Sequence, residues 1–206
     1  MSSCEKPIFV SIINESYTPG NQSPYIVRSW FSSIVGGVSG IVIDTLNITK
    51  EKFVATLMEV CKNHNRICLY LCIHGVQYRE NEEVHEKLKI NDKVEIPDYE
   101  FTAILNGLQY EELYIFNESC HGAGLFNSIV LDRNSIKIKN IILFNVCSKD
   151  QKCYVKIIST QSVGIVSHYL FTNRINPFKT PDIAYNAIKK YFPDLQTTVT
   201  LLKNLN

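Results

Sequence analysis

Residues 66–75 read Arg-Ile-Cys-Leu-Tyr-Leu-Cys-Ile-His-Gly and carry the clearest strand signal in the chain. The apolar run has the length and composition of a strand that is buried on both faces of a sheet. Comparable runs occur before and after it. Together they predict six strands, at residues 7–13, 40–44, 66–73, 112–117, 139–146 and 197–202.

Amphipathic segments lie between these runs and predict helices. In residues 47–62, for example, Phe53, Leu57 and Val60 recur at helical spacing. The predicted helices cover residues 25–35, 47–62, 97–108, 161–171 and 181–191. Apolar strands that alternate with helices indicate an α/β fold, with a mostly parallel sheet flanked by helices on both faces. The highly charged residues 78–87 are predicted to form a solvated loop.

Length and composition limit the class of protein. A chain of 206 residues without an internal repeat or a long linker predicts a single domain. Its 21 Lys and Arg nearly balance its 20 Asp and Glu, and a formal net charge of +1 argues against a dedicated nucleic-acid binder. No apolar run approaches the roughly 20 residues of a membrane-spanning helix, so we expect no membrane segment.

The cysteines indicate the compartment. There are seven of them, an odd number, and residues 1–7 do not resemble a signal peptide. Both observations favour a reducing compartment, so we expect a cytoplasmic protein with free thiols. Cys147 is then predicted to be a buried thiol and Cys153 a surface thiol.

Reactive residue types follow two of the predicted strands. His74-Gly75 comes directly after the strand at 66–73, and Glu118-Ser119-Cys120-His121-Gly122 comes directly after the strand at 112–117. Ligands of parallel α/β sheets bind beyond the carboxyl ends of the strands. If the two strands are neighbours, His74 and Cys120 reach the same edge, which is the arrangement of a Cys–His nucleophilic pair.

The chemistry assigns a role to each residue. A Cys120 thiolate would be the nucleophile, and His74 would act first as general base and then as general acid. The backbone N–H groups of Gly75 and Cys120 would form the oxyanion hole. The plainer interpretation is that Cys120 is a small buried apolar residue and His74 an ordinary loop residue.

The motifs resemble a known clan. Tyr70–Gln77 (YLCIHGVQ) resembles the strand and His-Gly turn of the caspase/metacaspase clan of cysteine peptidases. Glu118–Gly122 (ESCHG) is similar to the metacaspase motif Asp-Ser-Cys-His-Ser-Gly, and Leu143–Gln151 (LFNVCSKDQ) resembles the start of the small-subunit portion. The resemblance covers about residues 7–191. It divides the domain into a large-subunit-like portion at about 7–135 and a small-subunit-like portion at about 136–206.

The resemblance implies a caspase-like (Rossmann-like) fold and hydrolysis of protein or peptide substrates through an acyl-enzyme. Metacaspases cleave after Arg or Lys, and Glu118 stands at the position of the family's pocket Asp. We therefore expect Glu118 to line a pocket that prefers basic side chains. The linker cut in self-processing metacaspases corresponds to the region of Arg133, where cleavage is a further expectation.

Some features of the family are missing. The acidic cluster that binds activating calcium in many metacaspases is not evident, because only Asp150 follows Cys147 closely. We therefore expect no cofactor and no metal, although the resemblance allows calcium activation. Motif position six is Ala123 instead of Gly.

Three other hypotheses stay open. The first is a catalytically weak caspase-fold homologue that acts by binding a related peptidase or inhibitor. The second is a nucleotide-binding domain that uses Gly122–Gly124, although a lone G-x-G is a weak signal. The third is a zinc site, for which the spacing of the candidate ligands gives little support. Those candidates are Cys72, His74, Cys120 and His121.

Overall fold

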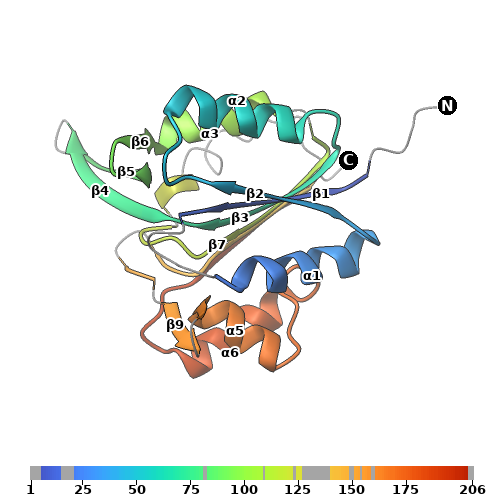
Figure 1. Cartoon of the computed structure of the whole chain (residues 1–206). Coiled ribbons are helices and arrows are strands. Elements are labelled where there is room, and N and C mark those ends of the chain that lie inside the picture. The colour runs from blue at the N-terminus through green and yellow to red at the C-terminus, as the bar shows by residue number, and fades with distance from the viewer. Residues whose placement is uncertain are drawn as a thin grey trace.

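A six-stranded sheet forms the centre of the protein in this computed structural model (Figure 1). The structure describes residues 6–14, 21–80, 83–108, 110–122, 124–126, 140–148, 151–153, 155–158 and 161–203. The strands are β1 (Ile8–Ile13), β2 (Ser39–Asp44), β3 (Arg66–Cys72), β7 (Glu112–Asn117), β8 (Asn140–Asn145) and β11 (Thr198–Lys203). Their order across the sheet is β11-β8-β7-β3-β1-β2. All pairs are parallel except β11 with β8.

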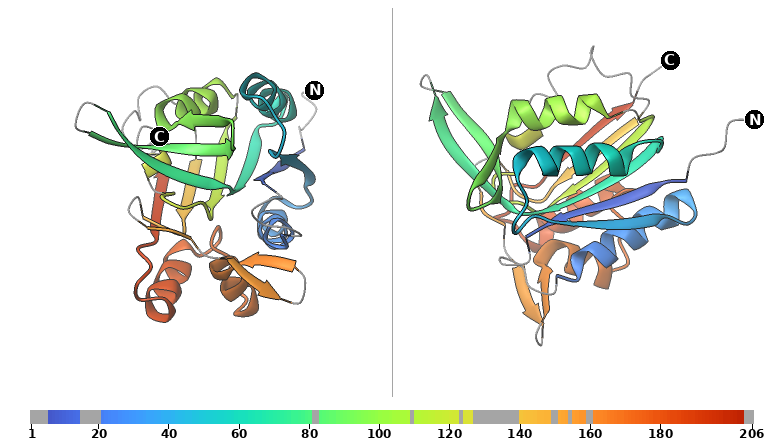
Figure 2. Two further views of the ribbon diagram at one scale, coloured as in Figure 1. Left: turned by 60° about the vertical axis from the view of Figure 1, so that its left-hand side comes forward. Right: turned by 45° about the horizontal axis from the view of Figure 1, so that its top comes forward.

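Helices cover both faces of this sheet. On one face lie α2 (Lys50–Cys61) and α3 (Asp98–Gly107), and on the other lie α1 (Ser23–Val35), α5 (Ile165–Thr172) and α6 (Pro181–Tyr191) (Figures 1 and 2). The prediction of a mostly parallel sheet with helices on both faces, in one domain, is confirmed. The arrangement agrees with a caspase-like fold. The expected border between the two portions, at residues 135 and 136, lies outside the described residues.

Alternating side chains of β3 divide the interior into two cores. Ile67, Leu69 and Leu71 pack in the core under α2 and α3. Cys68, Tyr70 and Cys72 pack in the core under α1, α5 and α6. Successive strand residues point to opposite faces of a sheet, so a strand covered on both sides must be apolar throughout. This is the physical reason for the unbroken run in the sequence.

Local signals set the helix ends. Thr49 caps α2, and its hydroxyl accepts a hydrogen bond of 3.3 Å from the Lys52 amide. Phe53 and Leu57 follow at a spacing of four residues and are fully buried. A glycine marks the C-terminal end of α1. The helix ends at Val35, and the C-cap residue Gly36 has a φ of 72°, a left-handed conformation that favours glycine.

The charged stretch after His74 is not a loop, and that prediction is wrong. Three strands form a separate antiparallel sheet: β4 (His74–Glu80), β5 (Glu83–Asn91) and β6 (Val94–Pro97). This sheet extends beyond the main sheet (Figure 2). Every second residue of β5 is apolar near its end, and Leu88 and Ile90 are fully buried in the core that contains α3. The charged residues around them, Glu86, Lys87 and Lys89, concealed this period of two.

A second difference lies before α5. The predicted helix at 161–171 begins only at Ile165, because residues 161–164 form β10 (Gln161–Gly164), paired antiparallel with β9 (Val155–Ile158). Gly164 is the last residue of β10 and the N-cap of α5, and its backbone conformation is extended. The chain also forms a short 3₁₀ turn, η1 (Gly124–Phe126), after the Cys120 motif.

Candidate active site

The ends of β3 and β7 bring the two predicted motifs together. The strands are parallel neighbours, and Leu71 of β3 lies opposite Asn117 of β7. Gly75 is buried so close to the next motif that a Cβ at this position would collide with the backbone carbonyl of Cys120. His74 lies one residue before this contact, at the exposed start of β4. The structure therefore places His74, Gly75 and Cys120 at one edge of the sheet.

Asn117 holds the turn that carries Cys120. Its side-chain oxygen accepts a hydrogen bond of 3.0 Å from the Ser119 amide, and its Nδ2 donates to the Gly122 carbonyl at 3.2 Å. The same Nδ2 donates to Asn145 Oδ1 at 3.2 Å, which ties the turn to β8. A Cβ on Gly122 would lie only 2.6 Å from Asn117 Nδ2. One buried amide thus fixes the conformation of the whole turn.

Two more hydrogen bonds attach this turn to its surroundings. Ser119 Oγ accepts from the Ile73 amide at 3.3 Å and links the turn to the end of β3. His121 has a φ of 54°, in the left-handed region, and its amide donates to the Gln151 carbonyl at 2.7 Å. The turn is therefore held from three sides, by β3, by β8 and by the segment around Gln151.

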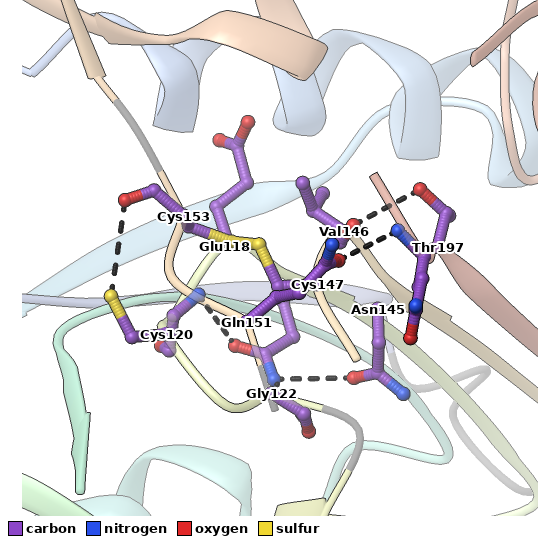
Figure 3. The surroundings of a disulfide bond; sticks show 12 residues. Glu118, Cys120, Gly122, Asn145, Val146, Cys147, Gln151, Cys153 and Thr197 are labelled. Atoms are coloured by element: carbon purple, nitrogen blue, oxygen red, sulfur yellow. Dashed lines mark hydrogen bonds between the residues drawn. A yellow bond between two sulfur atoms is a disulfide. The ribbon is translucent and has the colours of Figure 1, made fainter. Parts of the chain in front are cut away.

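The Cys120 thiol is half-buried at the tip of the turn. Its Sγ lies 3.8 Å from the backbone oxygen of Cys153, within the range of a weak S–H···O hydrogen bond (Figure 3). A thiol in this position is held by one neighbour and still reaches the surface. Such partial exposure is a requirement for a nucleophile.

The charges around His74 favour the neutral imidazole. Partial burial lowers the pKa of His74, although the residue is largely exposed. The positive charges of Lys89 and Lys152 lower this pKa further, whereas Asp92 acts in the opposite direction. Lys89 lies directly opposite His74 in the β4–β5 pairing and forms a 2.9 Å ion pair with Asp92. A neutral imidazole can accept a proton from a thiol, as a general base must.

Glu118 is buried, and both of its carboxylate oxygens accept hydrogen bonds. Tyr70 donates to Oε2 at 2.9 Å and the Ser167 amide donates to Oε1 at 3.0 Å. Burial raises the pKa of Glu118, and the hydrogen bonds from Ser167 and Tyr70 oppose this effect. A Cβ on Gly164 would collide with the carboxylate, so that glycine lets it lie against the start of α5. The side chain expected to line a pocket for basic side chains is thus enclosed by β3 and α5.

Further hydroxyl and amide groups surround this carboxylate. Ser23 Oγ and Ser167 Oγ are 2.8 Å apart, and Ser23 Oγ accepts from the Gly164 amide at 2.8 Å. Asn21 Nδ2 donates to the Tyr70 hydroxyl at 3.4 Å. Sequence reasoning missed Tyr70, Ser23 and Ser167. A tyrosine inside a wholly apolar strand is a usable signal because its hydroxyl needs a partner when buried.

The expectation of free thiols is wrong for one pair of cysteines. Cys147 and Cys153 form a disulfide with Cα atoms 5.9 Å apart, and Cys147 is fully buried (Figure 3). The chain turns back on itself after β8 and brings the two residues together, which their spacing in the sequence does not reveal. Among the residues that the structure describes, the free cysteines are Cys61, Cys68, Cys72 and Cys120.

A cleft of about 1110 Å³ lies elsewhere, between α1 and α5. Trp30 and Ser33 line one side of it, and His168 and Arg174 line the other. Neither Cys120 nor His74 lines this cleft. It is therefore separate from the edge of the sheet where the motifs converge.

Within the described residues, no group of three or more His, Cys, Asp or Glu side chains is close enough to hold a metal ion. The zinc candidates Cys72, His74, Cys120 and His121 are not gathered as a ligand set. No helix in the described ranges is both long and apolar enough to cross a membrane. Three positions singled out in the sequence, Ala123, Arg133 and Asp150, lie outside the described residues.

Comparison with known proteins adds no assignment. No protein-family model matches the chain, and a search of curated proteins finds no match. The evidence for a function therefore comes from the residues of the site itself.

Proposed function

We propose that the protein is a metacaspase-like cysteine endopeptidase that cleaves after Arg or Lys. The observation that carries the proposal is the convergence of two motifs at the carboxyl ends of adjacent parallel strands. His74-Gly75 follows β3, Cys120 follows β7, and Gly75 packs directly on the backbone of Cys120. The remainder of the site supports it, because the turn with Cys120 is rigidly held and the pKa of His74 is lowered.

The proposed reaction begins with transfer of the Cys120 thiol proton to neutral His74. The thiolate attacks the peptide carbonyl carbon, and the amides of Gly75 and Cys120 stabilise the oxyanion. The His74 imidazolium then gives its proton to the leaving amine as the C–N bond breaks. A water molecule, deprotonated by His74, hydrolyses the thioester and restores the thiol.

Glu118 gives this proposal its specificity. An ionised carboxylate has about four acceptor positions. Tyr70 and the Ser167 amide occupy two of them, and the Ser23 and Ser167 hydroxyls also hydrogen-bond to the carboxylate, so a charged donor would displace these two hydroxyls. A Lys or Arg side chain that reaches the carboxylate would compensate for its loss of hydration and favour the ionised form. Binding of a basic side chain would then release a proton from those molecules in which Glu118 is protonated.

The first test is hydrolysis of fluorogenic peptides that end in Arg, Lys or Asp, each with and without calcium. We expect cleavage after Arg and Lys, and loss of this activity in Cys120→Ala and His74→Ala. His85→Ala is the matched control, because His85 lies on β5 in the same small sheet and pairs with Tyr78 across it. Unchanged activity in Cys120→Ala would refute the proposal.

The same experiment addresses the binding-only alternative. That alternative is supported by the contact between Cys120 Sγ and the Cys153 carbonyl, which occupies the thiol, and by the enclosed position of Glu118. A folded protein that cleaves none of the peptides, and whose Cys120 does not react with iodoacetamide, would favour a catalytically weak homologue. Its partners would be a related peptidase or inhibitor, and we place either form in the cytoplasm as part of this proposal.

A further inference from the structure

Three cysteines gather beside the turn that carries the candidate nucleophile (Figure 3). Cys147 and Cys153 form a disulfide, and the Cys153 carbonyl faces Cys120 Sγ at 3.8 Å. The other described cysteines are buried in the two cores below the helices: Cys61, Cys68 and Cys72. Cys147 is buried in the same core as Cys68 and Cys72, and the half-buried Cys153 packs against that core.

The disulfide loop is attached to the nucleophile turn through Gln151, which lies between the two cysteines in the sequence. Its backbone oxygen accepts the 2.7 Å hydrogen bond from the His121 amide. Its side chain accepts from the Gln196 amide at 2.6 Å and donates to the Asp194 carbonyl. The segment closed by the disulfide thus contacts the nucleophile turn on one side and the connection between α6 and β11 on the other.

We infer that the Cys147–Cys153 pair is a reversible redox-modification site that controls the reactivity of the Cys120 thiol, with the disulfide as the less reactive state. The inference rests on the proposed function in taking Cys120 as the reactive residue. In the oxidised form the Cys153 carbonyl is held against Cys120 Sγ. A carbonyl oxygen accepts a hydrogen bond from an S–H group but repels a thiolate, and only the thiolate is a nucleophile.

Reduction removes this restraint. Without the covalent link, the backbone around Cys153 gains conformational freedom, because a disulfide limits the conformations of the loop it closes. The carbonyl can then move away from Cys120. In the cytoplasm, where the proposed function places the protein, disulfides are usually transient, and a reversible bond fits that rule.

The exchange needs a dithiol reductant such as dithiothreitol. One of its thiolates attacks the half-buried Cys153 sulfur, forms a mixed disulfide and releases Cys147 as a thiolate, which takes up a proton. The second thiol of the reductant then attacks the mixed disulfide, so Cys153 leaves as a thiol and the reductant becomes a cyclic disulfide. Two electrons pass to the protein. Oxidised glutathione reverses the reaction by accepting two electrons from the two cysteines.

The test measures alkylation of Cys120 by iodoacetamide in the full chain, with peptide mass spectrometry to follow each cysteine separately. The protein is first equilibrated with oxidised glutathione, and half of it is then reduced with dithiothreitol that is removed before labelling. We expect a Cys147–Cys153 linked peptide in the oxidised sample. We also expect Cys120 to react about fivefold faster after reduction, because this factor corresponds to the net free energy of one hydrogen bond.

Two variants make the result specific. In Cys147→Ser/Cys153→Ser, Cys120 should react at the fast rate whether or not the protein was reduced. In Cys61→Ala the disulfide is intact, so Cys120 should respond to reduction as it does in the unmodified chain. If the double variant does not fold, Cys153→Ser alone tests the same point, and the comparison of oxidised with reduced unmodified protein needs no variant.

Several outcomes would overturn the inference. They are the absence of the Cys147–Cys153 linked peptide after oxidation, an equal Cys120 rate in both states, and a disulfide that includes Cys120 itself. The readout does not depend on peptide cleavage. Redox-dependent alkylation in a protein that cleaves none of the peptides would therefore contradict the proposed peptidase and leave the redox site supported.

Discussion

The hydroxyl of Tyr70 donates a 2.9 Å hydrogen bond to the carboxylate of Glu118, two residues before Cys120. The bond joins the middle of β3 to the start of the nucleophile turn. Both partners are buried, so neither can exchange this bond for one to water. A buried polar group that loses its partner costs more free energy than the bond contributes on average. The Tyr70–Glu118 pair should therefore be sensitive to substitution on either side.

Tyr70→Phe should destabilise the fold by about 1–3 kcal/mol, because it leaves a buried carboxylate with one donor fewer. It should also raise the pKa of Glu118 further, since the Tyr70 hydrogen bond lowers that pKa. Urea denaturation measures the free energy of unfolding. Tyr25→Phe is the matched control, because Tyr25 is 68% exposed on α1. Equal stability of the two variants would contradict this account of Tyr70.

Glu118→Gln should change how stability depends on pH. Because the pKa of Glu118 is raised in the folded state, the folded protein retains this proton to a higher pH than the unfolded chain. The contribution of Glu118 to stability is therefore complete below its ordinary pKa of 4.5 and is lost as the pH rises through the folded pKa. Relative to Glu118→Gln, the unmodified chain should therefore lose stability as the pH rises from 4.5 through the raised pKa of the folded state.

Thermal unfolding at a series of pH values checks this expectation. Glu59→Gln, on the exposed face of α2, is the control. Its unfolding temperature should change with pH in the same way as that of the unmodified chain. A constant difference between Glu118→Gln and the unmodified chain over the whole series would show that Glu118 titrates as it does in the unfolded state. If the peptidase proposal holds, Glu118→Gln should also weaken the preference for Arg over Asp substrates.

Gly75→Ala should disturb the contact between the two motifs. The added methyl group would collide with the Cys120 carbonyl, so either β4 or the nucleophile turn must move. We expect a loss of stability of about 1–3 kcal/mol, as for other overpacked sites. The rate of Cys120 alkylation should also change. In the control Gly107→Ala, the new Cβ meets the Met58 side chain at ordinary contact distances, 3.5 Å to Cε and 3.9 Å to Sδ, and Cys120 should react as before.

Lys89→Gln should raise the pKa of His74. The Lys89 charge lowers this pKa, and its removal also takes the 2.9 Å ion-pair partner from Asp92, whose charge raises it. NMR titration of the His74 ring gives the pKa directly. Lys87→Gln is the control on the same strand, because Lys87 contacts Tyr78 and Glu95 instead. In a peptidase assay, the acidic limb of the pH profile should move to higher pH in Lys89→Gln only.

Much of the fold follows from local sequence. Burial on both faces requires continuous apolar strands, and the run at 66–73 corresponds to β3 at Arg66–Cys72 with an error of one residue. Convergence of His74 and Cys120 at one edge was predictable for the same reason, because neighbouring parallel strands end on the same side. The extra sheet of β4, β5 and β6 was not predictable, because its charged residues hide an alternation that becomes visible only when Leu88 and Ile90 are seen in the core.

The environment of the site was decided by tertiary packing. Glu118 accepts hydrogen bonds from Tyr70 and Ser167, which are 48 and 49 residues away in the chain, and Ser167 in turn contacts Ser23 of α1. The sequence determined which strand end carries each reactive residue, because hydrophobic periodicity is a local property. Only the packing of α1 and α5 on the sheet determined which groups surround those residues. Hydrogen bonds between distant segments form only after the helices and strands have packed together, so no local sequence pattern predicts which residues will be partners.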